Sequence, residues 1–343
     1  MIDIHTHFLP RSWPDLAARY GTPDWPWLKH SGGGGAMLMV GDKEFRPVTS
    51  ACWDAAVRLE AMDRDGVEIQ IMCATPLLFG YQRPALQALE CARLFNDAAR
   101  EICERAPRRL KSLCQVPLQD PELACRELSR AMADGHIGVH IGNHVGARDL
   151  NDEGLITFLE HCAAEGAAVF VHPWDMMGQE RMSRYQLPWL VAMPAETQLS
   201  ILWLILSGAF ERLPRSLKLC FAHGGGSFPY LLGRVDNAWR NRDIVREDCP
   251  HLPSSYVDRF CVDAAVFSAD ALEFLVKTMG EDRVMLGSDY PFPLGEQHVG
   301  SLIRSHPGLP AATREKLLHQ NARAFFGLDA PRAAVRAAAL VSA

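Results

Sequence analysis

Residues 1–8 read MIDIHTHF, a short apolar and β-branched run with histidines at positions 5 and 7. A run of this kind is typical of a buried strand. Because side chains alternate along a strand with a period of two residues, His5 and His7 project to the same side. Two imidazoles on one side of a strand can converge on one ion, and imidazole is a common ligand of zinc and its transition-metal neighbours. The stretch therefore predicts a first strand that contributes two ligands to a metal site.

Strand-like apolar runs and helical patterns alternate along most of the 343-residue chain. Alternation of strands and helices predicts a parallel sheet. Eight such units at this length predict a (β/α)8 TIM barrel, and a doubly wound open sheet is the alternative. The predicted strands span 2–8, 68–75, 110–117, 136–142, 168–174, 217–223, 260–265 and 283–289. The predicted helices span 52–65, 87–105, 121–134, 151–165, 192–212, 227–241, 267–280 and 311–325.

No linker or change of composition divides the chain, so we expect one domain that spans 1–343. The segment 9–51 is too long for an ordinary connection, and it contains a glycine-rich run and the hairpin-like sequence AMLMV-GD-KEFRPV. Because long loops after the strands of a barrel lie at its catalytic end, we expect a small inserted cap over the site. The tail 329–343, rich in Ala and Arg, is expected to be a peripheral helix or a frayed end.

Composition limits the binding partners and the cellular compartment that we expect for this protein. The net charge of −6 argues against nucleic acid or an anionic membrane as a partner. The ten cysteines include no C-x-x-C pair, and several, such as Cys73 and Cys220, lie inside apolar runs. We therefore expect reduced thiols in a cytoplasmic protein, an expectation that also draws on the lack of a signal-type segment before the first strand.

The apolar stretch 199–210 departs from the usual pattern of a helix on the outside of a barrel. It is too short to span a membrane. It is apolar nearly all round, whereas an outer helix normally has one polar face. A second copy of the chain is the simplest cover for its outer face, and the cap or the C-terminal tail is the alternative.

Polar residues end several predicted strands, and the active sites of such barrels lie at these C-terminal ends. Three imidazole nitrogens and one carboxylate oxygen suit Zn²⁺ with one open position for water, although Fe, Co or Mn also suits this donor set. None of the six lysines ends a predicted strand, so we expect one metal rather than a pair bridged by a modified lysine. The predicted metal ligands are His5, His7, His172 and Asp289.

His223 opens the run HGGGS after the sixth predicted strand, where glycines allow a ligand to approach the backbone closely. It could be a further metal nitrogen. We favour a catalytic base, because a metal lowers the pKa of its bound water to roughly 7 and a neutral imidazole can accept that proton. Asp175 and Asp263 are expected either to orient other site residues or to cap loops.

From the first strand to about residue 327, the chain resembles the amidohydrolase superfamily, which carries His-x-His on strand 1, histidines on strands 5 and 6, and aspartate on strand 8. Within it, longer segments resemble the family of 2-amino-3-carboxymuconate 6-semialdehyde decarboxylases. These segments are FRPV (45–48), CATPLLFGY (73–81), QVPLQD (115–120), IGNHVG (141–146), VHPWDMMG (171–178), LPWLVAMPAETQ (187–198), LSGAFERLP (206–214), HGGGSF (223–228), LLGRVDNAWRNRDIVREDCP (231–250) and GEDRVMLGSDYPFPLGEQ (280–297).

This resemblance implies a zinc enzyme that removes CO2 without an organic cofactor and that works as a homodimer. It also implies that two arginines hold the carboxylates of the substrate: Arg46 in FRPV, and Arg234, which reaches in from the neighbouring subunit. The residues themselves favour Arg46 as an anion-binding group on a hairpin over the site, whereas Arg234 alone would be a solvent-exposed arginine. Trp174, Tyr185 and Phe292 are expected pocket walls, and Tyr185 stands where we expect the family to carry a tryptophan.

The expected reaction converts 2-amino-3-carboxymuconate 6-semialdehyde to 2-aminomuconate 6-semialdehyde, in tryptophan (kynurenine) or nitrobenzoate breakdown. His223 deprotonates the metal-bound water, the hydroxide adds to the conjugated substrate, Asp289 or His223 protonates the adduct, and CO2 leaves. Direct protonation followed by loss of CO2 is a rival. Other functions left open are decarboxylation of a related aromatic acid, hydrolysis of a lactone or C–N bond, and a non-catalytic metal-bound binding module.

Overall fold

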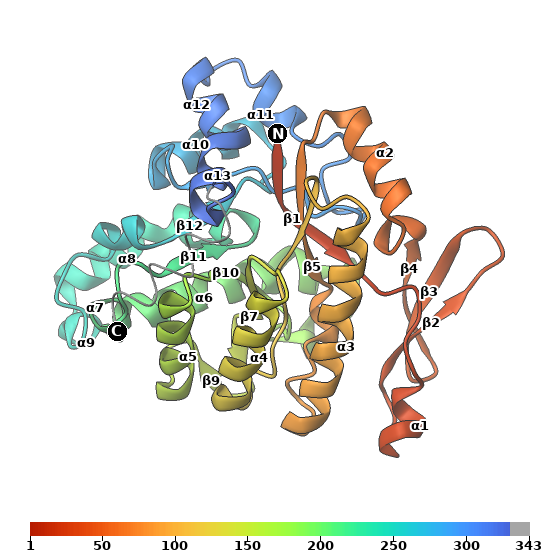
Figure 1. The fold of residues 1–343 in the computed structure, drawn as a ribbon. Coiled ribbons are helices and arrows are strands. Elements are labelled where there is room, and N and C mark those ends of the chain that lie inside the picture. The colour runs from red at the N-terminus through yellow and green to blue at the C-terminus, as the bar shows by residue number, and fades with distance from the viewer. Residues whose placement is uncertain (330–343) are drawn as a thin grey trace.

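The computed structural model describes residues 1–329, so the expectation for the tail 329–343 lies outside the described residues from position 330 onward. The predicted strands form a three-stranded and a five-stranded sheet, with the helices arranged around them (Figure 1). Neighbouring strands within both sheets are parallel, which confirms the predicted parallel α/β fold. In sheet order the strands are β1 (Ile2–Phe8), β5 (Ile69–Ala74) and β6 (Leu110–Ser112), then β13 (Val284–Met285), β12 (Cys261–Asp263), β11 (Lys218–Phe221), β10 (Ala168–His172) and β7 (Gly138–Gly142).

Backbone hydrogen bonds join the two sheets at both of their edges. On one side, the amide of His140 in β7 donates to the carbonyl of Cys114, which follows β6, over 2.7 Å. On the other side, which we call the β1 seam, β1 meets residues 286–290 after β13, and the amide of His7 donates to the carbonyl of Tyr290 over 2.7 Å. The β1 seam brings the end of the first strand beside Asp289.

The helices occupy the predicted positions and are started by side-chain caps where the sequence offers an aspartate. Asp54, Asp120 and Asp152 accept hydrogen bonds from the first free backbone amides of α2, α4 and α5. The helices are α1 (Leu16–Tyr20), α2 (Ala55–Asp65), α3 (Ala85–Glu104), α4 (Pro121–Ala133), α5 (Glu153–Ala164), α6 (Met193–Leu206), α7 (Ala209–Arg212), α8 (Phe228–Asn241), α9 (Asp243–Arg246), α10 (Ala269–Met279), α11 (Ser301–Ser305), α12 (Ala311–Glu315) and α13 (Asn321–Phe326).

Two predicted helices are divided in the structure. The predicted helix 192–212 forms α6 and α7, because Gly208 between them adopts a left-handed conformation with φ 72°. A Cβ at this position would lie 2.5 Å from the carbonyl oxygen of Asp248, so only glycine fits. The predicted helix 311–325 forms α12, a π-helical turn (Lys316–Gln320) and α13.

The segment between β1 and α2 forms an antiparallel sheet of its own, which lies beside α2 and α3 in Figure 1. Its strands are β2 (Pro26–His30), β3 (Gly35–Val40) and β4 (Lys43–Thr49), and the hairpin between β3 and β4 stands where the sequence predicts it. The pairing runs from Leu38 opposite Arg46 to Met39 opposite Glu44, so Phe45 is the extra residue of a β-bulge. Bulges change the direction of neighbouring side chains, and this one precedes Arg46.

One helical stretch of the described residues is long and apolar enough to cross a membrane by length and composition. It is Pro188–Leu206, a π-helical turn continued by α6, with a mean hydropathy of 1.4 and 39% of its length buried within the structure. Most of the apolar stretch 199–210 lies in this segment, and its last two residues begin α7. Glu196 is buried on its inner side, whereas Leu199 and Trp203 are 37% and 40% exposed. The outer face of α6 is thus partly apolar and exposed among the described residues.

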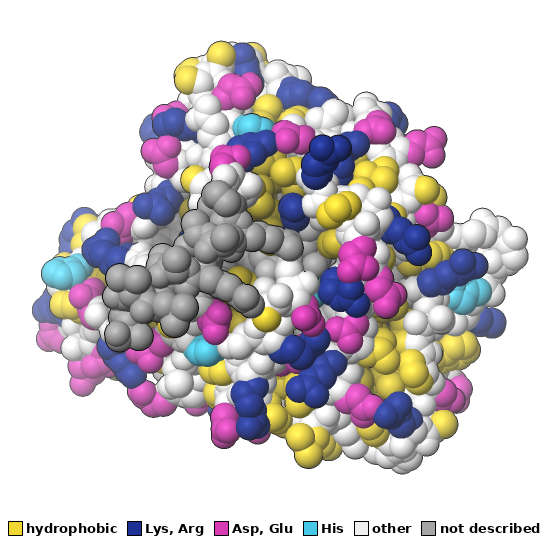
Figure 2. All heavy atoms as spheres, viewed as in Figure 1, with side chains coloured by type: hydrophobic (Ala, Val, Ile, Leu, Met, Phe, Trp, Pro, Cys, Tyr) yellow, Lys and Arg dark blue, Asp and Glu magenta, His cyan; other side chains and the backbone are white. Residues whose placement is uncertain are grey.

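The face of the molecule in Figure 2 carries acidic and basic side chains in alternation, with hydrophobic side chains between them. No broad field of one sign covers the described atoms on this face. A surface of this kind gives little long-range attraction for a polyanion.

A candidate metal centre at the ends of the strands

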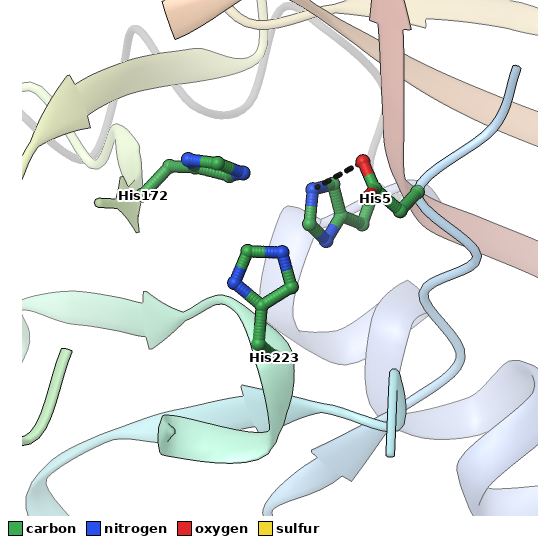
Figure 3. A group of neighbouring side chains, drawn as sticks. His5, His172 and His223 are labelled. Carbon is green, nitrogen blue, oxygen red and sulfur yellow. Dashed lines mark ion pairs between the residues drawn. The ribbon is translucent and has the colours of Figure 1, made fainter. Parts of the chain in front are cut away.

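Imidazoles from distant parts of the chain meet at the carboxyl ends of the parallel strands. Figure 3 shows His5, His172 and His223 directed toward one another from β1, β10 and the turn after β11. One donor atom from each of these rings and one carboxylate oxygen of Asp289 lie within 4.8 Å of one another. His7 adjoins the group, with its Nε2 3.0 Å from Asp289 Oδ1 and 3.1 Å from His5 Nε2. The structure therefore gathers the four predicted ligands and places His223 among them.

Asp263, at the end of β12, orients His5. Its Oδ2 lies 2.6 Å from His5 Nδ1, and its Oδ1 accepts hydrogen bonds from the amides of Gly224 and Ala265. Burial by itself lowers the pKa of His5, but the hydrogen bond and the charge of Asp263 outweigh it and raise that pKa. Asp263 thus fulfils both roles expected for it, since it orients a histidine and also caps a turn.

The other two predicted histidine ligands are held in the same way. His172 Nδ1 donates to the carbonyl of Pro173 over 2.7 Å. The Cys73 thiol donates to the carbonyl of Thr6, so its sulfur is free to accept from His7 Nδ1, 3.5 Å away. An outer partner on Nδ1 fixes the tautomer and leaves Nε2 for a metal, as in most metal-binding histidines. His5, His7 and His172 all have such a partner.

His223 differs from these three, because its buried Nδ1 has no hydrogen-bond partner among the described residues. Burial disfavours the charged ring and lowers its pKa to about 4, so the imidazole is neutral at neutral pH. The residue has a φ of 55°, in the left-handed region that few side chains adopt. The turn continues through Gly226, where a Cβ would lie 2.2 Å from the carbonyl oxygen of Pro194. Close packing therefore fixes His223 in a strained backbone, which is common at functional sites.

Asp289 also has a left-handed backbone, with a φ of 61°. Its amide donates to the carbonyl of His5 over 2.9 Å across the β1 seam. Burial alone would raise the pKa of its carboxyl, but the hydrogen bond with His7 and the neighbouring histidines outweigh it and hold that pKa well below the usual range. The side chain is therefore a carboxylate at any pH near neutrality.

Arg46 lies beside this cluster. Its guanidinium carbon lies 4.7 Å from the centre of the Phe292 ring, 4.9 Å from that of Phe45 and 6.0 Å from that of Trp189. The Phe292 ring is in turn 5.2 Å from the ring of His7. The side chain of Arg46 makes no ion pair with a described residue. An arginine held between aromatic rings next to a metal-ligand cluster is well suited to bind a carboxylate.

Trp174, in the loop after β10, is firmly packed. Its Nε1 donates to the carbonyl of His144 over 2.8 Å, and its ring meets that of Tyr81 edge to face. A Cβ on Gly142 would lie 2.5 Å from the Trp174 ring, so the close approach requires glycine there.

Two predicted substrate residues are exposed at the surface of the chain. Tyr185 is 74% exposed, with a φ of 59°, and the guanidinium of Arg184 lies over its ring. Arg234 is exposed on α8. Neither residue is buried at the metal centre of its own chain. For Arg234, surface exposure is also what the residue by itself led us to expect.

Three residues around the site were not singled out by sequence reasoning. Trp189 packs near Arg46, and Asn143 and Glu196 tie the loops after β7 and β10 to α6. Glu196 accepts from Asn143 Nδ2 over 2.9 Å and from the amide of Met177 over 2.8 Å. The only sequence signal for them was their place in two quoted segments, IGNHVG and LPWLVAMPAETQ.

Comparison with solved structures places this geometry in a known fold. The Metarhizium anisopliae protein named IDCase, in its apo form, matches 96% of this chain and 97% of its own with a TM-score of 0.83 at 22% identity. A dihydroxybenzoic acid decarboxylase from Polaromonas sp., solved with bound manganese and an inhibitor, matches 96% of this chain and 97% of its own with a TM-score of 0.76 at 23% identity. At these identities the likeness concerns the fold.

Sequence comparison is more specific. The amidohydrolase family model matches residues 2–328. The 2-amino-3-carboxymuconate-6-semialdehyde decarboxylase of Dictyostelium discoideum is 44% identical over 330 residues, which cover 96% of this chain and 92% of that protein. The protein of the same name from Caenorhabditis elegans is 31% identical over 96% of this chain and 94% of its own. The chain therefore belongs to the amidohydrolase family, and within it to the group of the 2-amino-3-carboxymuconate-6-semialdehyde decarboxylases.

Proposed function

We propose that this protein decarboxylates 2-amino-3-carboxymuconate 6-semialdehyde to 2-aminomuconate 6-semialdehyde with a single divalent metal and no organic cofactor. The observation that carries the proposal is Arg46, a partly buried arginine whose guanidinium lies between aromatic rings beside the metal-ligand cluster and makes no ion pair with a described residue. The family membership supports the same reaction. The expected place of this reaction is tryptophan or nitrobenzoate breakdown.

We also propose that the two parallel sheets act as one closed (β/α)8 barrel, with the 9–51 insertion as its cap. The hydrogen bonds at both sheet edges support the closure. The place of Arg46 on β4, next to Phe292, supports the cap. Because every strand then ends at the same mouth, the ligands need no further element to gather them.

The donor set fits a divalent metal. His5, His7 and His172 each keep Nε2 free through an outer partner on Nδ1, and Asp289 is held as a carboxylate. Three nitrogens and one oxygen suit zinc, which we propose as the resident ion at one per subunit, with manganese as the alternative. Such an ion supplies Lewis-acid activation when bound.

The side chains of the site carry out the proton transfers. His223 is neutral, so it can take a proton from water at the start of the reaction. The resulting hydroxide adds to the conjugated substrate, and the carbon that bears the carboxylate must then receive a proton. We assign that proton to the His223 imidazolium rather than to Asp289, because the low pKa of Asp289 makes it a poor acid. Loss of CO2 supplies the electron pair that expels the hydroxide again and restores the conjugation.

The second carboxylate of the substrate requires a second cation. We propose that Arg234 of a neighbouring subunit supplies it in a homodimer. Arg234 is exposed, and Tyr230, one turn earlier on the same face of α8, is 80% exposed. The apolar outer face of α6, with Leu199 and Trp203, offers further surface for a second copy.

We propose the cytoplasm as the compartment. Buried cysteines such as Cys73, Cys114 and Cys220 carry free thiols. Reduced thiols are typical of proteins that work in a reducing compartment.

The test is product analysis with the metal-loaded protein. Incubation with the semialdehyde should release one CO2 per substrate and give 2-aminomuconate 6-semialdehyde, identified by mass. An Arg46→Lys protein is the matched control, since it keeps the charge but loses the planar fork, and it should raise KM more than it lowers kcat. A hydrolysis product without CO2, or turnover only of aromatic carboxylic acids, would contradict the proposal.

A further inference from the structure

Arg58 on α2 is a buried cation that the proposed chemistry does not use. Its side chain is 1% exposed and is the largest fully buried side chain in the described part of the chain. It forms no ion pair with a described residue. Burying an unpaired charge costs free energy, which hydrogen bonds to the charged group must offset.

The contacts of Arg58 all go to neutral groups near the β1 seam. Its Nη1 donates to Gln70 Oε1 over 3.0 Å and to Thr6 Oγ1 over 3.1 Å. Its Nη2 donates to the carbonyl oxygen of His7 over 2.5 Å. The guanidinium carbon also lies 5.2 Å from the centre of the Tyr290 ring. One rigid, planar group therefore touches both sides of the seam.

Each side of this contact adjoins a metal-ligand candidate. The carbonyl that Arg58 binds is that of His7 itself, and the ring that it covers belongs to the residue after Asp289. The amide of His7 donates to the carbonyl of Tyr290, so the peptide units on both sides of the His7 Cα are held. If the backbone of His7 turned, His7 Nε2 would leave its position 3.0 Å from Asp289 Oδ1.

We propose that Arg58 is a positioning residue that holds His7 and Asp289 together before the metal binds. The inference rests on the proposed metal site, since it gives Arg58 a role toward two of its ligands. The planar fork matters here, because it reaches three acceptors in fixed directions while its face lies on an aromatic ring. A lysine in its place would keep the charge but could not satisfy these directions together.

The experiment measures metal affinity of the metal-free protein by chelator competition, with zinc as the probe. Outer partners of metal ligands typically change affinity by about 10- to 100-fold. Arg58→Met should therefore bind zinc about 10- to 100-fold more weakly, and Arg58→Lys should recover part of the loss. Arg64→Met is the matched control on the same helix, because Arg64 is 58% exposed and pairs with its neighbour Asp65. The zinc affinity of this variant should equal that of the unaltered protein.

A second measurement depends neither on turnover nor on the Arg58→Met substitution. Gln70→Met removes one acceptor of Arg58 and leaves every ligand in place. In the metal-free protein, hydrogen exchange at the amides of His7 and Asp289 should be faster in Gln70→Met and Arg58→Lys than in Arg64→Met. Equal exchange and equal zinc affinity in these proteins would overturn the role of Arg58. Failure of the unaltered protein to bind zinc or manganese would instead overturn the metal site itself.

Discussion

His5 Nδ1 and Asp263 Oδ2 lie 2.6 Å apart, and both side chains are completely buried. The pair connects β1 to β12, two strands that are not neighbours in either sheet. Asp263 also accepts hydrogen bonds from two backbone amides, so its carboxylate is held in place independently of the His5 ring. The tautomer of His5, and hence the availability of its Nε2, depends on this one carboxylate.

Replacing this carboxylate should weaken the metal site. Asp263→Asn removes the charge that supports the His5 ring, and we expect metal affinity to fall by about 10- to 100-fold. Chelator competition on the purified protein measures the change. Asp175→Asn is the control, because the side chain of Asp175 is exposed beside the site and should leave affinity unaltered. Unchanged affinity in Asp263→Asn would show that His5 needs no such partner.

The metal content should follow the predicted ligand set. Elemental analysis of the purified protein should give about one divalent ion per subunit, and His172→Ala should lose most of it. His161→Ala replaces a histidine on α5 that bonds Ser129 away from the cluster, and it should keep its metal. Two ions per subunit, or full loading of His172→Ala, would exclude the single-metal site.

His223 should be needed for turnover but not for the metal. A general base contributes roughly 10²- to 10⁴-fold to a rate, so His223→Ala should lower kcat by that factor while metal content stays the same. The reason is the unpartnered Nδ1, which distinguishes this ring from the three histidines with a fixed tautomer. If the metal is lost with the side chain, His223 is a ligand and the base must be sought elsewhere.

Two inactive proteins should restore activity when they exchange subunits. One carries Arg46→Ala together with His223→Ala, and the other carries Arg234→Ala. In a hybrid dimer, one barrel keeps its own Arg46 and His223 and receives an intact Arg234 from the other chain. Activity should then return in proportion to the hybrid, measured as CO2 release. A proven hybrid without activity would mean that Arg234 serves its own barrel or none.

The buried residue His136 should make the protein less stable in mild acid. Burial lowers its pKa from 6.5 to about 4, and its ring is hydrogen-bonded to Ser112. Between these values the unfolded chain binds a proton that the native state does not, so the free energy of unfolding falls as the pH drops below 6.5, by roughly 2 kcal/mol at pH 5. Urea unfolding at pH 5 and 7.5 should show this difference shrink in His136→Gln but not in His251→Gln, a surface control. An equal pH dependence in both variants would rule out His136 as the cause.

The sequence was most informative where local geometry decides the outcome. The alternation in residues 2–8 is enough to place His5 and His7 on one side of a strand. The rule that active-site residues end the strands of a parallel barrel then located His172, His223 and Asp289. These residues are brought together by strand order alone, which alternating strands and helices largely determine.

The sequence was least informative where tertiary contacts outweigh residue type. Arg58 lies in an ordinary amphipathic helix, where arginine is nearly always exposed, and only the packing of α2 on β1 buries it. Glu196 stands in an apolar stretch and would not be expected to accept two hydrogen bonds in the interior. Tyr185, expected as a pocket wall because of the resemblance, has a left-handed backbone and is exposed.

The β1 seam also has a consequence for the synthesis of the protein. His5 and His7 are made before Asp289 and the segment that pairs with β1, which follow about 280 residues later in the chain. Until then, one edge of the first strand has no partner, and its histidines lack their carboxylate. Contacts this distant along the chain form late in folding, because the entropy of the intervening chain must be overcome first. Metal capture by the complete donor set is therefore a late event in the maturation of this protein, because it waits for the segment that carries Asp289.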